Sequence, residues 1–592
     1  MTIHRSIRLI SLSVALVGVM TCTSSIVAAP NSVYQPLGAP ADPLVAARWN
    51  FYRDYAEATG LLKQIAAAHP KWCRLESLGQ SYGGRELWVM TITNQADTSE
   101  NEDSKPGFWI DGGIHANELQ AVDVVLYTAW YLAETAERSE FTQRLLNERV
   151  IYLMPMMSPD SRDAHMYRPN STNSPRGGQM PVDDDRDGLV DEDPSEDLDG
   201  DGSITQMRIR DPNGKYKVHP EYPNYMVRIE PGELASFTGE RYTLLGSEGF
   251  DNDGDGRVNE DGDGYYDPNR DWAWQWQPGY MQRGAYRYPF SIKANRLVAE
   301  FITDHPNIAG GQSYHNTGGM ILRGPGSNSD SWPRGDIAVF DRLAKRGEEM
   351  LPGYRYLNTA KGLYEVWGGE HDWLFAMRGI FAFTNELNTP FNLFRKKGDA
   401  GSWFGSALDR YRFDRLLLFG EGFVDWHEVD HPEYGRIEVG GQKKNWGRQP
   451  PSFMLEEECH RNMAFTLFHA DQGPLVEIDR IEVEPLAGGL RQVTATLINR
   501  RLTPTRARHD VQNGITAPDR VELTGPTVVA ALMSDSVVFD RPEEVTRDPA
   551  AIRLERLASQ TPKYIRWLVT GNEQPTVTIR SVKGGTATKS AE

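Results

Sequence analysis

The chain has 592 residues, three cysteines and a formal net charge of −19. This length predicts two or more domains with a large core, and so few cysteines exclude a disulfide-rich scaffold. Residues 183–201 hold eleven acids and one base, and residues 251–267 hold seven acids and one base. These windows contribute −10 and −6, so the remainder is nearly neutral. No basic surface for nucleic acid is therefore expected.

Residues 1–29 have the pattern of a signal peptide. His4, Arg5 and Arg8 precede an apolar run from residue 9 to residue 20, and Val27-Ala28-Ala29 offers a small-residue cleavage site. That run is too short for a comfortable membrane span, and no later stretch reaches eighteen apolar residues. We expect a secreted or periplasmic protein without a stable membrane span.

A His-x-x-Glu pair follows the first strongly apolar strand-like run. Residues 108–111 predict a buried strand, Gly112-Gly113 a turn, and residues 119–134 a helix. His115 and Glu118 can therefore bind one cation from the same side, and two histidines with one glutamate form a catalytic zinc set. On this motif alone, a helix-entry histidine with an acid in the first helical turn remains an alternative.

The order of predicted elements indicates an α/β fold with a mixed sheet flanked by helices. Strand-like segments include residues 87–92 and 150–155. We place the catalytic domain at residues 45–430, with acidic insertions at about 158–268, and a linker at residues 431–474. Strand follows strand after residue 475, as at residues 493–498 and 564–569, which predicts an additional C-terminal β-sandwich at residues 475–586.

Two further polar residues end strand-like segments. His315 closes residues 312–315, and Glu386 closes the apolar run 381–386. In open α/β sheets, sites form at the carboxyl ends of strands. Taken singly, a core histidine and a strand-end surface acid remain alternatives.

Together these motifs resemble the zinc metallocarboxypeptidase family (carboxypeptidase A-like) across residues 52–428. The resemblance implies that His115, Glu118 and His315 bind one catalytic zinc ion, and that Glu386 is the general base. It also implies that Asn269, Arg270 and Tyr364 hold the terminal carboxylate of the substrate. Glu386 follows Tyr364 by twenty-two residues, which is the spacing of the family.

The function implied is zinc-dependent hydrolysis of the C-terminal peptide bond of peptides or proteins with a free C-terminus. The family also has an arginine that stabilises the oxyanion. Arg176 is preferred here because it precedes the acidic insertion, and Arg168 is the alternative. The pocket for the terminal side chain is expected to involve Glu370 and His371.

The acidic windows contain three loops with alternating aspartates and a following glycine. This pattern, with Gly188, Gly202 and Gly256, is typical of calcium loops and is similar to thrombospondin type 3 and dockerin repeats. A solvated acidic loop is the alternative. We expect structural calcium at nine candidate residues: Asp183, Asp185, Asp187, Asp197, Asp199, Asp201, Asp251, Asp253 and Asp255.

One zinc-like string is expected to be a coincidence. His427-Glu428-Val429-Asp430-His431 matches His-Glu-x-x-His, but that motif works only on a helix, and Pro432 disfavours helix at residue 431. Two other functions were weighed: a deacylase or amidase that acts on a small molecule with the same fold, and a non-enzymatic calcium-dependent binding protein.

Overall fold

The computed structural model describes residues 37–95, 104–262, 264, 266–396 and 405–592. The predicted signal peptide at residues 1–29 lies outside the described residues. Residues Pro43–Glu592 form one compact unit, and the architecture below is that of this unit. Within the described part of the chain, no helix has the length and apolar character needed to cross a membrane.

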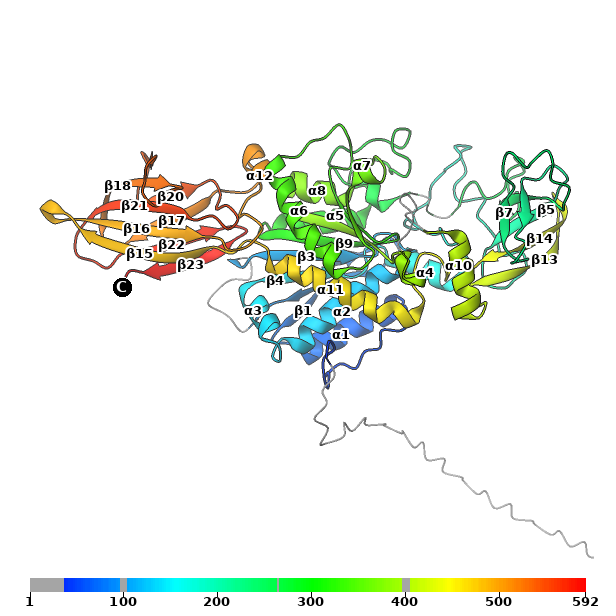
Figure 1. The fold of residues 1–592 in the computed structure, drawn as a ribbon, viewed down its shortest axis with the longest axis horizontal. Coiled ribbons are helices and arrows are strands. Elements are labelled where there is room, and N and C mark those ends of the chain that lie inside the picture. Colours follow the sequence, from blue (N-terminus) through cyan, green and yellow to red (C-terminus); the bar gives the residue numbers. More distant parts are fainter. Residues whose placement is uncertain (1–36, 96–103, 263, 265, 397–404) are drawn as a thin grey trace, which may run out of the picture. The chain divides into compact units, whose positions relative to one another are not determined.

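An eight-stranded mixed sheet forms the centre of the α/β fold (Figure 1), which confirms the predicted fold class. Its central strands β4, β3, β9 and β12 are mutually parallel, and β3, β4 and β9 are buried along their whole length. Buried parallel strands explain the apolar runs in the sequence. The strand order is β1 Cys73–Gln80, β2 Glu86–Ile92, β4 Val150–Met154, β3 Gly107–Gly112, β9 Ile308–Asn316, β12 Phe381–Leu387, β10 Met320–Arg323 and β11 Arg355–Asn358.

Helices cover both faces of this sheet (Figure 1). Side chains alternate across a strand, so Phe108 and Ile110 of β3 join one hydrophobic cluster while Trp109 joins the other. The first cluster is covered by α1 Tyr55–Ala68, α2 Leu119–Thr135 and α3 Glu140–Glu148. The second is covered by α5 Lys293–Asp304 and α8 Glu370–Arg378, and α6 Arg334–Met350 packs beside β10 and β11.

The predicted linker at residues 431–474 is wrong for most of its length. It contains β14 Gly435–Gln442 and the seventeen-residue helix α11 Leu455–Asp471. Leu455, Cys459 and Met463 of α11 lie in the same hydrophobic cluster as α2. The core of the catalytic sheet therefore continues beyond residue 430. Cys459 and Cys73 are both buried and free.

Four strands of the acidic insertion and the later strands β13 and β14 form a second, six-stranded antiparallel sheet, called the insertion sheet below. Its order is β13 Phe423–His431, β14, β5 Gln206–Arg210, β8 Tyr242–Ser247, β6 Tyr216–Val218 and β7 Met226–Arg228. A small core of Met207, Ile437 and Val439 holds this sheet together. The His-Glu-x-x-His string lies in β13, so it is a strand and not a helix, as expected from Pro432. His427 contacts Asp199 and His431 bonds to the carbonyl of Gly249, so the two rings have different partners.

The C-terminal region consists of two antiparallel sheets around their own hydrophobic cluster, as predicted for a β-sandwich. One sheet has the order β15 Glu477–Pro485, β16 Leu490–Ile498, β21 Lys563–Thr570, β18 Thr527–Ser534 and β19 Glu543–Glu544. The other has the order β20 Ala551–Leu554, β17 Asp519–Thr524, β22 Thr576–Ser581 and β23 Gly585–Ser590, so the predicted end at residue 586 falls within β23. Shorter helices are α4 Pro159–Tyr167, α7 Thr359–Gly362, α9 Phe391–Phe394, α10 Ala407–Phe413 and α12 Arg508–Asn513.

Candidate active site

Three neighbouring parallel strands bring the candidate catalytic residues to one edge of the central sheet. His115 and Glu118 follow β3, His315 lies near the end of β9, and Glu386 lies near the end of β12. In the β9–β12 pairing, Glu386 is directly opposite His315. Sites in α/β sheets form at the carboxyl ends of strands, and this arrangement follows that rule.

Gly112 and Gly113 allow the chain to turn tightly between β3 and the metal-binding loop. A Cβ atom on Gly112 would lie 2.7 Å from the carbonyl oxygen of Ala121 in α2. Gly113 has φ of +66°, a conformation that glycine adopts without steric cost. The two glycines therefore let α2 start close to the strand and place His115 and Glu118 on the same side.

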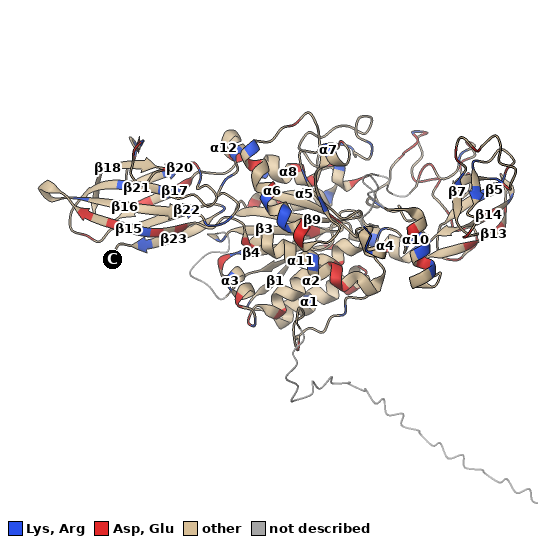
Figure 2. Ribbon diagram, in the orientation of Figure 1, with Lys and Arg blue, Asp and Glu red and all other residues tan. Residues whose placement is uncertain are grey.

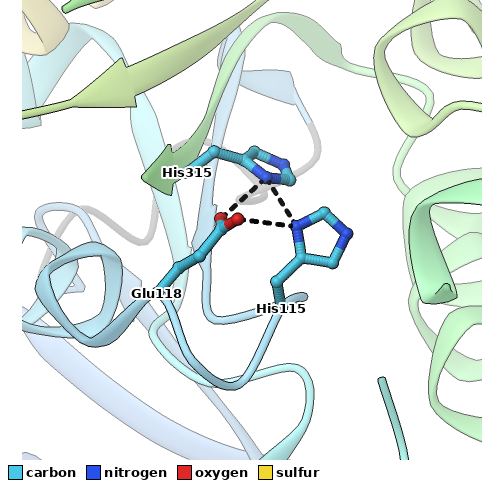
Figure 3. Close-up of side chains that lie close together, drawn as sticks. All are labelled: His115, Glu118 and His315. Carbon is cyan, nitrogen blue, oxygen red and sulfur yellow. Dashed lines mark hydrogen bonds and ion pairs between the residues drawn. The ribbon is translucent and has the colours of Figure 1, made fainter. Parts of the chain in front are cut away.

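His115, Glu118 and His315 converge in a buried cluster (Figure 3). The Nδ1 atoms of the two histidines lie 3.1 Å apart, and the two Glu118 oxygens lie 3.1 Å and 3.0 Å from them. Each of the three side chains is 2% exposed. Zinc in proteins binds imidazole nitrogen and carboxylate oxygen at about 2.0–2.2 Å, so ligand atoms a little over 3 Å apart suit one ion. The donor set fits zinc and leaves the fourth position to water or substrate.

Asp267 orients His115 from the other side of the ring. Its Oδ1 lies 2.7 Å from His115 Nε2, so the opposite nitrogen, Nδ1, is the one directed at Glu118 and His315. Burial acts to raise the pKa of Asp267, but Arg270, His115 and Arg176 outweigh it and hold that pKa well below its ordinary value. A carboxylate that accepts from a metal-binding imidazole fixes its tautomer and orientation.

Arg176 lies against the metal cluster, whereas Arg168 is exposed at the end of α4. Arg176 donates to Glu118 Oε1 at 2.7 Å, and its Nε lies 3.6 Å from Asp267 Oδ2. Burial acts to lower the pKa of Arg176, but Glu118 and Asp267 reverse that effect and raise it. For Glu118, burial acts to raise the pKa, but His115, Arg176 and His315 together hold it well below its ordinary value. A charged arginine thus stands beside an ionised ligand carboxylate.

Glu386 lies beside the metal cluster in a largely enclosed position. Burial, reinforced by the nearby charge of Glu118, raises the pKa of Glu386 to about 7. A carboxylate with a pKa near neutrality can both accept and release a proton at physiological pH. This is the property that a general base and acid requires.

Asn269 and Arg270 form the short turn η2 Pro268–Arg270, which packs against the loop before α8. Asn269 Oδ1 accepts from the backbone N–H of Glu370 at 2.9 Å, and Arg270 is 9% exposed with Asp267 Oδ2 at 3.7 Å. Tyr364 is 49% exposed, and its phenol interacts electrostatically with Arg176. The two η2 side chains are therefore fixed in place, while Tyr364 stands at the solvent side of the site.

Glu370 and His371 are buried at the start of α8. The hydroxyl of Ser313 donates to Glu370 Oε2 at 3.2 Å and contacts Asp111 at 2.8 Å, so two acids share one partner. Burial, followed by repulsion from Asp111, raises the pKa of Glu370 well above its ordinary value. These surroundings therefore favour the protonated form of Glu370 more strongly than solvent would.

Two residues at the site were missed by the sequence analysis. Asp267 lies two residues before Asn269 of the Asn269–Arg270 pair, so its place in the sequence could have indicated that it belongs to the site. Arg448 gave no signal, because it lies in the segment predicted as a linker. Its guanidinium is 3.7 Å from Glu118 Oε1 and donates to the carbonyl of Asn316 at 3.0 Å.

In all three acidic loops the first aspartate accepts from the N–H group three residues further on, and in the second and third loops it also accepts from the N–H group five residues further on. In the second loop, Asp197 accepts from the N–H groups of Gly200 and Gly202, and in the third, Asp251 accepts from those of Gly254 and Gly256. The glycines that follow the third aspartate of each loop, Gly188, Gly202 and Gly256, all have positive φ.

Folding brings the first and third acidic loops together, because Asp185 groups with Asp255 and Glu260, and Asp187 groups with Glu192 and Asp253. Figure 2 marks the acidic residues in red. Asp183, Asp185 and Asp187 form one group of converging carboxylates, and Asp185 also groups with Glu192 and Asp261. Asp261 is fully buried, and among the described residues neither of its carboxylate oxygens has a hydrogen-bond partner in good geometry. Burial, followed by its interaction with the neighbouring Glu192, raises the pKa of Asp261 to about 7. Glu192 and Asp261 were not among the residues proposed from the sequence.

Comparison with known families agrees with this geometry. Residues 59–174 and 249–397 match a family model described as zinc carboxypeptidase. These two segments belong to the zinc carboxypeptidase family. The zinc carboxypeptidase segments contain the His115–Glu118–His315 cluster and Glu386, whereas Arg176 lies in the unmatched stretch between them. Residues 475–592 match a domain family of unknown function.

Individual relatives of the zinc carboxypeptidase segments are similar over short stretches. A zinc carboxypeptidase of Saccharothrix mutabilis subsp. capreolus is 29% identical over 109 residues, which cover 18% of this chain and 24% of that protein. Carboxypeptidase Z of Homo sapiens is 33% identical over 110 residues, which cover 18% of this chain and 17% of that protein. The match thus spans a quarter or less of either relative. One similar solved structure is that of bovine thrombin-activatable fibrinolysis inhibitor in complex with a tick carboxypeptidase inhibitor. Its sequence is 15% identical and its TM-score is 0.42. The alignment covers 72% of this chain and 99% of that chain.

Proposed function

We propose that this protein is a zinc-dependent carboxypeptidase that removes the C-terminal residue of peptides or proteins. The observation that carries the proposal is the convergence of His115 Nδ1, His315 Nδ1 and the Glu118 carboxylate in one buried cluster. Glu386 and the Asn269–Arg270 turn lie around the same cluster. The site therefore contains a candidate general base and a candidate group for binding a carboxylate.

Zinc held by His115, Glu118 and His315 would supply a Lewis acid that polarises water and the scissile carbonyl. Glu386 would accept the proton of the attacking water and pass it to the leaving amine. Arg176 would stabilise the negative charge that develops on the carbonyl oxygen, since a positioned cation in an enclosed site is effective there. Asp267 would keep His115 in the tautomer that leaves Nδ1 free.

Arg270 and Asn269 would hold the substrate by its terminal carboxylate, with Tyr364 covering it from the solvent side. A guanidinium forms charge-assisted, bidentate hydrogen bonds with a carboxylate. This set favours an exopeptidase over a deacylase or amidase. Without a free carboxylate on the substrate, Arg270 would keep its hydrogen bond to the carbonyl of Asn269 at 2.7 Å and would have Asp267, at 3.7 Å, as its carboxylate neighbour among the described residues. A purely calcium-dependent binding role would not require Glu386 beside the metal cluster.

We further propose that the acidic insertion binds structural calcium. The nine aspartates of the three loops supply oxygen ligands, and Glu192 and Asp261 join them. A fully buried carboxylate without any partner is costly unless a cation or hydrogen-bond donor compensates it. Asp261 is buried beside Glu192 and has no hydrogen-bond partner in good geometry among the described residues, which favours a bound cation over a solvated acidic loop.

We also propose that the protein is exported. The basic start, the apolar run and Val27-Ala28-Ala29 support removal of residues 1–29 or a segment close to that length. Intact mass measurement of the protein recovered outside the cytoplasm should give a chain that begins near residue 30. A full-length chain retained inside the cell would contradict export.

The experiment that tests the enzymatic proposal is metal removal and restoration. The purified enzyme should contain about one zinc ion in the triad, in line with a single catalytic site. A zinc chelator should abolish release of the C-terminal amino acid from a test peptide, and added zinc should restore it. Peptide hydrolysis that persists after zinc is removed would contradict the proposal.

A further inference from the structure

A cavity lies beside the metal cluster of His115, Glu118 and His315, between the insertion sheet and the rest of the unit. Its volume is about 620 Å³, within the range of ligand-binding pockets. The insertion sheet contributes Tyr216, Tyr225, Phe423 and Trp426, and α10 contributes Arg410. None of the described lining residues is acidic, although the insertion that helps to build the cavity carries most of the negative charge of the chain.

Arg448 connects this cavity to the catalytic residues. It lines the cavity, and the same guanidinium lies 3.7 Å from Glu118 and donates to Asn316 at 3.0 Å. Thr317, which follows Asn316, also lines the cavity. Neither Asn269, Arg270 nor Tyr364 is among its described lining residues. The cavity therefore adjoins the metal cluster without including the residues that would hold the C-terminal carboxylate.

Arg410 is a cation without a carboxylate partner among the described residues. Its NH1 donates to the carbonyl of Gly447 at 3.5 Å, and its buried Nε has no hydrogen-bond partner in the part of the chain that the structure describes. By contrast, Arg412 on the same helix pairs with Asp409 at 3.6 Å. An enclosed guanidinium without a counter-charge favours binding of an anion.

We propose that this cavity binds the part of the substrate that lies upstream of the scissile bond, and that it selects peptides with acidic side chains there. The inference rests on the proposed carboxypeptidase function. A peptide held at its terminus by Arg270 must continue past the metal cluster, where Arg448 and the cavity begin. Arg410 and Arg448 then attract carboxylates, while the rings of Tyr216, Tyr225 and Trp426 contact the backbone and apolar parts of the chain.

Matched peptides with the same C-terminal residue test this selectivity. One set carries Glu at the second to fourth positions before the scissile bond, and the other carries Gln at those positions. For the wild-type enzyme, kcat/KM should be about tenfold higher for the Glu peptides, as expected for a charge-assisted contact in a partly enclosed site. The preference should shrink at high ionic strength. Equal rates, or a preference for Gln, would overturn the inference.

The variant Arg410→Gln should reduce the preference to about twofold or less, mainly by lowering kcat/KM for the Glu peptides. Arg410→Lys should retain most of the preference, and Arg412→Gln is the matched control because it lies on the same helix and does not line the cavity. Arg448 is a poorer choice, since it contacts the metal ligand Glu118. A full Glu preference in a folded Arg410→Gln protein would overturn the assignment to this cavity.

Binding to the variant Glu386→Gln separates this inference from the proposed function. Its Kd for the Glu peptides should be about tenfold lower than for the Gln peptides, by the same charge-assisted contact. If no peptide is hydrolysed by the wild type but this difference in Kd is present, the carboxypeptidase function fails and the anion-selective cavity stands. If peptides are hydrolysed but neither kcat/KM nor Kd depends on the upstream charge, the cavity inference fails alone.

Discussion

Asp267 links the two charged halves of the site at the residue scale. It accepts from His115 on one side and faces Arg176 and Arg270 on the other. Its low pKa means that it is ionised at neutral pH, so it can orient the imidazole through a charge-assisted hydrogen bond. A residue with no direct contact to the reaction can in this way control metal affinity.

Asp267→Asn should weaken zinc binding by about 10–100-fold, the usual cost of losing a carboxylate behind a metal-binding histidine. Competition with a chromogenic chelator measures this affinity. Glu118→Gln, which removes a ligand, is the reference variant and should bind zinc more weakly still. If Asp267→Asn bound zinc as tightly as the wild type, the orienting role would be wrong.

Glu386→Gln should retain stoichiometric zinc and lower kcat by at least about 10²-fold, because amide replaces the group that moves the proton. Zinc content by mass spectrometry and steady-state kinetics on one peptide check the two parts separately. A near-normal kcat in this variant would exclude Glu386 as the base. Loss of zinc from the variant would indicate that Glu386 acts in metal binding instead.

At the scale of elements, the catalytic edge of the sheet was predictable because its strands are buried along all or most of their length. Parallel buried strands read as continuous apolar runs, and those of β9 and β12 end close to His315 and Glu386, two of the residues proposed for the site. Helix α11 was not predicted. Its buried face includes Asn462 and Thr466 beside Met463 and Leu467, so its polar residues mask the helical period, and Pro450-Pro451 suggests a linker just before it.

The strands of the acidic insertion were also not predicted, for a different reason. β6 and β7 have three residues each, and their flanks are rich in Asp, Gly, Pro and Asn. Such short strands give too few positions for an alternating pattern to stand out. The loops themselves were recognisable, because the aspartate spacing and the positive-φ glycines are local requirements. Which loops meet depends on the tertiary fold, so Asp261 could not be assigned from sequence.

Calcium removal should lower the melting temperature of the protein while zinc stays bound. A cation that binds only the folded state adds about 2.7 kcal/mol at a free concentration of 100 times Kd. Differential scanning calorimetry with calcium and with a calcium-selective chelator measures the effect. Asp261→Asn should reduce the response to calcium, and the exposed acid Asp540 provides the control variant Asp540→Asn. An unchanged melting temperature on calcium removal would reject structural calcium.

At the scale of the whole molecule, acidic and basic side chains gather in different regions. The acids gather in the insertion loops, whereas the cavity beside the metal cluster has two arginines and no acid among its described lining residues. The α/β architecture and the sandwich followed from sequence patterns that repeat along the chain. The position of Arg448 beside Glu118 did not follow from such patterns. The segment that carries Arg448 is distant in the sequence, and the packing of α11 and the insertion sheet brings it to the site.

The most direct test of the account is cleavage of matched peptides that end in a free carboxylate or in an amide. A free carboxylate gives Arg270 a charged partner, and an amide offers only a neutral oxygen. The loss should cost about 1.5–3 kcal/mol, or roughly ten- to a hundredfold in kcat/KM. Mass spectrometry of timed digests should therefore show single residues lost from the acid peptides and little loss from the amides. Equal cleavage of both, or cuts at internal bonds, would contradict the carboxypeptidase assignment.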